Sequence, residues 1–149
     1  MLIGKTVEEI QIGEKATFAK TISETDVYNF AGVTGDMNPV HVNQPYVENT
    51  FFKSRIAHGI LSSSLITNVL GTKLPGPGTL YKRQEFKFLK PVYIGDTIEA
   101  SVEIVDIDKE NNEVKVKTAC INQKGDIVVE GFAWVLPPTK KEKEKAYVI

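Results

Sequence analysis

Both histidines of the chain lie in one short region that also holds a carboxylate. The sequence Gly-Asp-Met-Asn-Pro-Val-His over residues 35–41 brings Asp36 close to His41, and Ile-Ala-His-Gly over residues 56–59 places His58 directly before Gly59. Imidazole is the side chain that titrates near neutral pH. A carboxylate and an imidazole have different resting pKa values, so Asp36 and His41 can hold one water molecule and divide its proton transfers between them. The spacing predicts acid/base chemistry.

The turn between these two groups contains Asn38-Pro39, which cannot lie inside a helix or a central strand because proline fixes φ and lacks an N–H. We expect Asn38 to support the loop. A purely structural alternative stays open: Asp36 then ends a helix, and His41 is a histidine whose ring is satisfied by the fold.

Gly59 opens a run of small and apolar residues that reads as a helix. Helix N-termini carry unpaired N–H groups, and glycine allows a substrate carbonyl to approach closely. Such a donor stabilises a growing oxyanion by on the order of 3 kcal/mol. His58 either supports this site or caps the polar backbone.

Two other chemistries were weighed against this one. Asp36, His41 and His58 are permitted zinc ligands, but the chain has no His-x-x-x-His pair and no cysteine beside them, so we predict no metal. Ser62 to Ser64 and Thr67 suggest a serine hydrolase, yet the Gly-x-Ser-x-Gly elbow is absent. We expect these hydroxyls to allow close packing and to bond the substrate or the catalytic groups.

The elements that carry this region follow from periodicity. Alternation predicts a strand over residues 15–22, and Ser23 begins a helix that ends at Gly32 or Gly35. Residues 36–57 form a long connection with one helical turn over 46–51, and long ordered connections are usually functional. The helix over residues 59–70 carries no charge, which predicts that it is buried.

From Thr79 onward the period changes to two, with turns at Pro91, Gly95-Asp96, Asn111-Asn112 and Lys124-Gly125. Phe86 and Phe88 share one face of the first of these strands. Long strands joined by short turns predict an antiparallel sheet with one covered face. An α+β fold, with the sheet wrapped around the uncharged helix, satisfies both elements.

The chain has 149 residues and a net charge of −1, which suits one domain and disfavours a nucleic-acid partner. No apolar run approaches the length of a membrane span, and no signal peptide is visible, so we expect a cytoplasmic protein with no membrane partner. The single cysteine, Cys120, is expected to be a small buried hydrophobe. We divide the chain into a domain over 1–136 and a charged, solvated tail over 137–149.

At this point the chain resembles a known family, the (R)-specific enoyl-CoA hydratases or MaoC-like dehydratases. The resemblance covers roughly residues 10–136. It is carried by Tyr28 with residues 35–41, by Phe52 with residues 56–61, and by Tyr81, Gln84, Phe88, Pro91-Val92 and Gly95-Asp96.

The resemblance implies a hot-dog fold, which is a long antiparallel sheet around a central helix, and a homodimer or higher homo-oligomer. It also implies that Asp36 and His41 are the catalytic pair, and that the Gly59 N–H binds the thioester oxygen. Thr67 matches the family's helix hydroxyl, with Ser64 as second choice; serine is usual there, and proline is usual where Arg55 stands.

The activity implied is the interconversion of a trans-2-enoyl-CoA and water with a (3R)-3-hydroxyacyl-CoA, without a cofactor. Lys82, Arg83, Lys87 and Lys90 are candidates for contacting the CoA phosphates. Two alternatives stay open: a non-catalytic acyl-thioester-binding subunit, and a dehydratase of 3-hydroxyacyl-[acyl-carrier-protein]. A thioesterase is the least supported variant.

Overall fold

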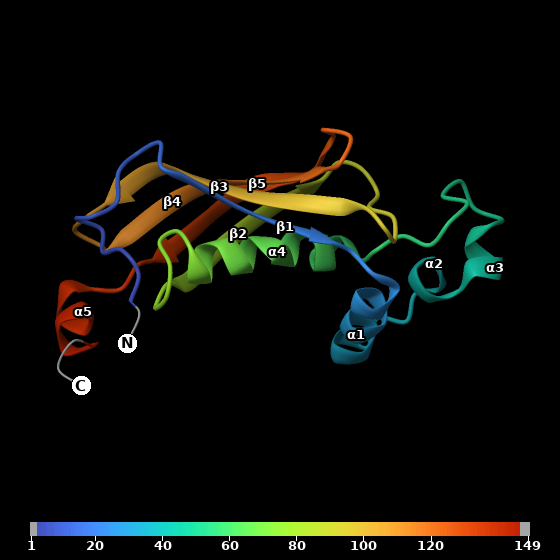
Figure 1. Cartoon of the computed structure of the whole chain (residues 1–149), viewed down its shortest axis with the longest axis horizontal. Coiled ribbons are helices and arrows are strands. Elements are labelled where there is room, and N and C mark those ends of the chain that lie inside the picture. The colour runs from blue at the N-terminus through green and yellow to red at the C-terminus, as the bar shows by residue number, and fades with distance from the viewer. Residues whose placement is uncertain (1–2, 147–149) are drawn as a thin grey trace.

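The computed structural model describes residues 3–146 and consists of one curved sheet, one long helix against it, and short helices at both ends (Figure 1). The elements follow in the order β1 (Lys15–Thr21), α1 (Glu24–Thr34), α2 (Pro39–Val42), α3 (Gln44–Val47), α4 (Gly59–Thr72), β2 (Leu80–Phe88), β3 (Thr97–Asp108), β4 (Glu113–Asn122), β5 (Ile127–Leu136) and α5 (Lys140–Ala146).

The five strands pair antiparallel in the order β1-β3-β4-β5-β2. The register brings Val102, Thr118, Gly131 and Phe86 into one row across four strands. Val102 and Thr118 are buried, because this row faces α4. The two-residue alternation therefore predicted the covered face correctly, and the α+β, sheet-around-helix fold is confirmed.

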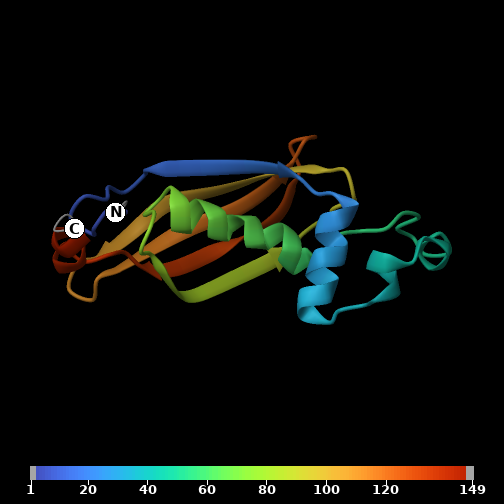
Figure 2. The same cartoon turned by 60° about the horizontal axis from the view of Figure 1, so that its bottom comes forward.

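Helix α4 lies across the concave face of the sheet (Figure 2). Ile66 and Leu70 are fully buried against the strands, whereas Ile60, Ser64 and Thr67 on the opposite side are exposed. The prediction of a buried helix is thus correct for one face only, since lack of charge does not reveal which side the sheet covers. Within residues 3–146, none of the helices combines the length and apolar character that crossing a membrane requires.

The connection between α1 and α4 forms two short helices earlier in the chain than predicted. The side-chain oxygens of Asn38 and Asn43 accept backbone N–H bonds at the starts of α2 and α3, and proline occupies the first turn of each. Asparagine caps and early prolines both favour helix starts. The helical turn predicted over residues 46–51 therefore begins earlier, at residue 44, and a further helical turn begins at residue 39, because the two asparagine caps start the helices there.

The outer face of the sheet carries two large aromatic side chains. Phe132 and Trp134 pair with Glu85 and Arg83 of β2 and with Lys117 and Lys115 of β4. The cations of Arg83 and Lys115 lie 4.5 and 5.1 Å from the Trp134 ring centroid. Long cationic side chains thus cover aromatic surface that α4 does not reach.

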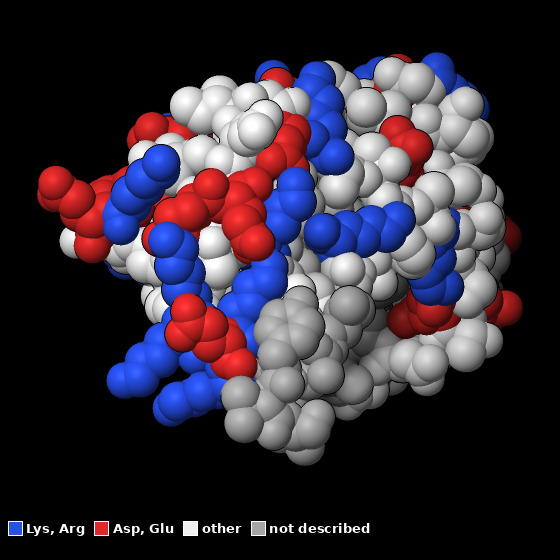
Figure 3. All heavy atoms as spheres, turned by 60° about the vertical axis from the view of Figure 1, so that its left-hand side comes forward, with Lys and Arg blue, Asp and Glu red and all other residues white. Residues whose placement is uncertain are grey.

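The charged run near the C-terminus forms the short helix α5, and most of its side chains are exposed, as expected for a solvated segment. Lys143 pairs with Glu9 at 2.6 Å, and Ala146 is buried. Figure 3 shows basic and acidic side chains interleaved on this end of the molecule. Residues 147–149 of the predicted tail lie outside the described residues, and the boundary at residue 136 stays a prediction.

Candidate active site

The end of α1 aims Asp36 toward the start of α4. Gly35 adopts a left-handed conformation (φ 76°) and its N–H donates to the Ala31 carbonyl, which closes the helix. The Asp36 N–H then donates to Thr34 Oγ1 at 3.2 Å, and the Asp36 carboxylate accepts the Asn38 N–H at 3.1 Å. Glycine reverses the chain and two local bonds hold the next residue, so the position of the Asp36 carboxylate relative to α1 is fixed.

His41 lies in α2, with its ring locked by a carbonyl from the following loop. Its Nδ1 is 2.8 Å from the Ile56 carbonyl oxygen, and the residue is 8% exposed. A carbonyl can only accept, so the proton lies on Nδ1 and Nε2 carries a lone pair. The fold therefore presents His41 Nε2 as a proton acceptor.

His58 is also held by a backbone carbonyl, but through its other ring nitrogen. Its Nε2 is 3.0 Å from the backbone carbonyl oxygen of Asp36, which assigns the proton to Nε2. Its ring stacks on His41 with centroids 3.8 Å apart and planes at 28°, and Phe30 lies 4.9 Å from its centroid. His58 thus ties the Asp36 loop to the start of α4 and supports one face of the His41 ring.

The three groups converge as the spacing predicted. A carboxylate oxygen of Asp36 and one ring nitrogen each of His41 and His58 lie within 4.8 Å of one another. The Asp36 side chain is 51% exposed and the His58 side chain 3% exposed. Asp36 and His41 can therefore share one water molecule that is reached from solvent on the carboxylate side.

The same geometry fits a divalent cation poorly. His41 Nδ1 is occupied by the Ile56 carbonyl, which leaves His41 only Nε2 as a ligand atom. His58 Nε2 also donates to Asp36, which removes it as a ligand atom. The donor set therefore suits proton transfer to water better than zinc coordination.

Burial sets the charge state of His41. Desolvation lowers the pKa of its imidazole, the bond to Ile56 opposes this, and the neighbouring His58 lowers it further while Asp36 raises it. A lowered pKa keeps the ring neutral at physiological pH. A neutral ring can act as a base.

Helix α4 begins at this point without a side-chain cap. Its N-cap residue is His58, and no side chain accepts the first N–H groups. At Gly59 an added Cβ would lie 2.8 Å from the Phe88 ring. Glycine lets the half-exposed Phe88 ring pack against the backbone here, and the same absence of a side chain leaves the N–H accessible.

A cavity of about 460 Å³ opens beside this helix terminus. His41, Gly59 and Ser62 supply its polar groups and Lys90 stands in its wall, while the remaining lining is apolar. The apolar residues are Phe52, Ile56, Ala57, Ile60, Phe88, Leu89, Pro91, Val92 and Val129. Largely apolar walls with a few convergent polar groups are typical of a site for a small organic ligand.

The predicted helix hydroxyls lie elsewhere. Ser64 is exposed and its Oγ donates to the Leu61 carbonyl at 2.6 Å. Thr67 is also exposed, and it lies beside the Tyr81 phenol, whose pKa is raised by burial. Neither side chain lines the cavity. Ser62 does, although spacing alone did not single it out from its two serine neighbours.

Arg55, at the position where a proline was expected, joins the loop to α1. Its guanidinium pairs with Glu24 and donates to the Tyr28 hydroxyl at 2.8 Å. These contacts fix the segment that supplies the Ile56 carbonyl to His41. The departure from the family pattern is therefore accommodated by an ion pair, and it leaves the acid/base pair intact.

Cys120 takes no part in the chemistry. Burial raises the pKa of its thiol to about 12, and its Sγ donates to the Ser62 carbonyl at 3.5 Å. The interpretation of Cys120 as a small buried hydrophobe is confirmed.

Sequence reasoning missed Ile56, Phe30 and Phe88 as parts of the site. Ile56 acts through its backbone carbonyl, which leaves no mark on residue type. Phe30 was placed only on a helix face, and its contact with His58 depends on how α1 docks. For Phe88 a signal existed, because the alternation put it on the covered face of its strand, where it meets Gly59.

Comparison with known proteins places this geometry in a family. The family model for the MaoC-like domain matches residues 7–124. The chain belongs to the MaoC-like family. Among MaoC-like relatives, it is 49% identical over 133 residues to an (R)-specific enoyl-CoA hydratase of Rhodospirillum rubrum, an alignment that covers 89% of this chain and 92% of the relative.

Two further proteins are similar to this chain over nearly its whole length. A 3-hydroxybutyryl-CoA dehydratase of Methylorubrum extorquens is 41% identical over 138 residues, covering 92% of this chain and 87% of the relative. The unliganded structure of an R-hydratase of Pseudomonas aeruginosa superposes with a TM-score of 0.87 at 40% identity, covering 92% of this chain and 88% of that one. The hot-dog fold expected from the resemblance is thereby confirmed.

Proposed function

We propose that this MaoC-like protein is an (R)-specific enoyl-CoA hydratase, a hydro-lyase that interconverts trans-2-enoyl-CoA plus water with (3R)-3-hydroxyacyl-CoA. The observation that carries the proposal is the convergence of the Asp36 carboxylate and the His41 ring beside the uncapped start of α4, at the wall of an apolar cavity. Relatives named for this activity over nine-tenths of the chain support it.

In the hydration direction, the site holds one water between Asp36 and His41. The neutral Nε2 accepts a proton as the water oxygen forms its bond to C3, and the C2=C3 π electrons move toward the thioester oxygen. The Gly59 N–H stabilises the resulting enolate oxygen. The imidazolium then returns the proton to C2, so the elements of water have added across the double bond and His41 is neutral again.

We propose that the reaction needs no metal or redox cofactor. Conjugation with the thioester already polarises the double bond, so a base, a proton and an oxyanion donor suffice. The bond from His58 Nε2 to the Asp36 carbonyl supports this view, since it withdraws that nitrogen from a cation.

The carrier is proposed to be CoA, with Lys90 contacting its phosphates. Lys90 stands in the cavity wall and pairs with Asp126 at 2.7 Å. The other candidates, Lys82, Arg83 and Lys87, do not line the cavity. Exchanging Lys90→Glu is expected to raise the KM for crotonyl-CoA but not for crotonyl-pantetheine, whereas Lys15→Glu, at an ion pair with Glu103, should change neither.

We further propose that the protein is a homodimer. Strand β2 ends the sheet order, so its outer edge lacks a strand partner in the described chain. Leu80 and Phe88 on this strand and Ile60 on the open face of α4 are each about half exposed or more. A second copy paired along this edge would cover them. Light scattering should give twice the chain mass of 16.5 kDa, and a monomer mass would contradict the proposal.

The decisive experiment follows the loss of the conjugated thioester absorbance when purified protein meets crotonyl-CoA. The product should be (3R)-3-hydroxybutyryl-CoA, and the (3S) isomer should not be dehydrated. Crotonyl-acyl-carrier-protein in the same assay separates the two carriers. Tight crotonyl-CoA binding without turnover would overturn the enzymatic proposal in favour of a thioester-binding subunit.

A further inference from the structure

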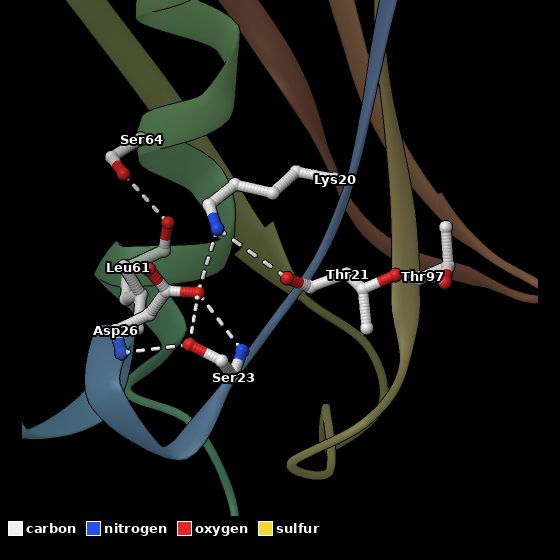
Figure 4. A network of polar contacts seen from close by, with 7 residues as sticks. All are labelled: Lys20, Thr21, Ser23, Asp26, Leu61, Ser64 and Thr97. Carbon is white, nitrogen blue, oxygen red and sulfur yellow. Dashed lines mark hydrogen bonds and ion pairs between the residues drawn. The ribbon is translucent and has the colours of Figure 1, made fainter.

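The three consecutive serines of α4 differ in what their hydroxyls do. Ser63 Oγ donates to the Ile60 carbonyl at 3.1 Å, and Ser64 Oγ donates to the Leu61 carbonyl at 2.6 Å, as Figure 4 shows for the second pair. Ser62 Oγ is fully buried and has no hydrogen-bond partner among residues 3–146. It is also the one of the three that lines the cavity beside His41 and Gly59.

An unpaired buried hydroxyl costs free energy, so its presence calls for an explanation. Serine in a helix ordinarily relieves this cost by bonding a carbonyl one turn back, as the two following serines do. Ser62 forgoes that bond while its own carbonyl accepts Cys120 Sγ. Its hydroxyl is therefore left for a group that enters the cavity.

Helical geometry indicates which atom of a ligand the Ser62 hydroxyl would contact. Residues three apart lie on the same face of a helix, and side chains lean toward the N-terminus. The Ser62 hydroxyl thus leans toward the turn that begins with Gly59. A thioester oxygen that accepted the Gly59 N–H would therefore lie beside the helical turn that carries this hydroxyl.

We propose that Ser62 is a second oxyanion donor: its hydroxyl donates a hydrogen bond to the thioester oxygen alongside the Gly59 N–H. The proposal rests on the hydratase function above. Charge develops on that oxygen only as the O–C3 bond forms, so the bond to Ser62 strengthens in the transition state. Its loss therefore lowers kcat more than it raises KM.

The test compares Ser62→Ala with Ser63→Ala, which removes a buried but already paired hydroxyl from the next position. With crotonyl-CoA, S62A should lose roughly 10- to 100-fold in kcat with little change in KM, as for a hydrogen bond to a charged group. S63A should retain the wild-type kcat. The urea midpoint of S62A should equal or exceed that of the wild type, because alanine removes an unpaired polar group.

Three results would contradict the inference. Equal kcat in S62A and S63A would show that the hydroxyl does not meet the reacting oxygen. A raised KM with unchanged kcat would show that it binds only the ground state. An inactive wild type would overturn the hydratase function and this inference together, whereas an active wild type with a normal S62A overturns the inference alone.

Discussion

The N-termini of α1 and α4 use their free N–H groups in opposite ways. At α1, Ser23 Oγ accepts the Asp26 N–H at 3.1 Å, and Asp26 Oδ2 accepts the Ser23 N–H at 2.8 Å (Figure 4). Lys20 completes this cap by pairing with Asp26 at 2.8 Å. At α4, His58 provides no side-chain cap, and the first residue is a glycine next to the cavity.

The difference separates stability from function along one chain. A complete capping box satisfies the helix terminus internally and stabilises the fold. An uncapped terminus retains donors that a ligand can use, and in this protein it lies where an acid/base pair converges. Substitutions at α1 should therefore change the free energy of unfolding, and substitutions around α4 should change turnover.

The largest expected effect comes from the acid/base pair. Asp36→Asn keeps an oxygen that can accept the Asn38 N–H, so the fold should survive. Its kcat/KM on crotonyl-CoA should fall by about 10³-fold or more, as should that of His41→Ala, because the first removes the carboxylate that holds the water and the second the base that takes its proton. Steady-state assays and urea unfolding measure the two properties separately.

Asp26→Asn is the matched carboxylate at the other helix. It should lower the free energy of unfolding by about 1 kcal/mol while kcat stays within about twofold of the wild type. Asp36→Asn with wild-type turnover, or Asp26→Asn with the larger loss of activity, would invalidate the separation between the two helix starts.

The next effect concerns the two glycines of α4. Gly59→Ala places a methyl group 2.8 Å from the Phe88 ring, so the ring or the helix start must move. Displacing the N–H from the thioester oxygen should lower kcat by about 10²-fold. Gly71→Ala meets nothing within 4 Å, and should raise the free energy of unfolding by up to about 1 kcal/mol without changing kcat. Equal kcat in both variants would remove Gly59 from the mechanism.

Several features of the fold and the site were predictable from residue patterns. The capping box at Ser23, the glycine that ends α1 and the two-residue alternation are local signals, because each depends on neighbours in the sequence. They were sufficient to predict the strands, both long helices and the covered face. The pairing of Asp36 with His41 followed from type and spacing within one short loop.

What sequence patterns did not reveal depends on contacts between distant segments. The stacking of His41 on His58 and the tie between Arg55 and Glu24 arise only when α1 docks beside the loop. The role of Ser62 depends on a rotation of α4 that three serines in a row cannot specify. The charged C-terminal run was correctly expected to be exposed, but its pairing of Lys143 with Glu9, near the other end of the chain, was not predicted.

A smaller, graded effect is expected from pH. Burial lowers the pKa of His41 in the folded protein, so its ring stays neutral below the ordinary value of about 6.5 and becomes protonated only as pH falls through the lowered value. Activity should therefore persist below pH 6.5 and decline only as pH falls through the lowered pKa of His41. The decline should reach about tenfold per pH unit once His41 is mostly protonated.

NMR titration of the His41 ring tests the cause. Asp36 raises the pKa of His41, so Asp36→Asn should move the titration to lower pH still, while Asp26→Asn should leave it in place. A pKa at or above about 6.5 in the wild type would contradict the buried, neutral base.

The smallest effect sharpens the comparison most directly, because α1 carries a cap at one end and Asp36 just beyond the other. Ser23→Ala removes the hydroxyl that accepts the Asp26 N–H, and should lower the free energy of unfolding by about 1 kcal/mol in urea titrations. Turnover should remain within about twofold of wild type, since Gly35, Thr34 and His58 hold the Asp36 loop independently of the cap. A tenfold loss of kcat would instead mean that fraying at the start of α1 reaches the carboxylate, and that the two helix starts act as one unit.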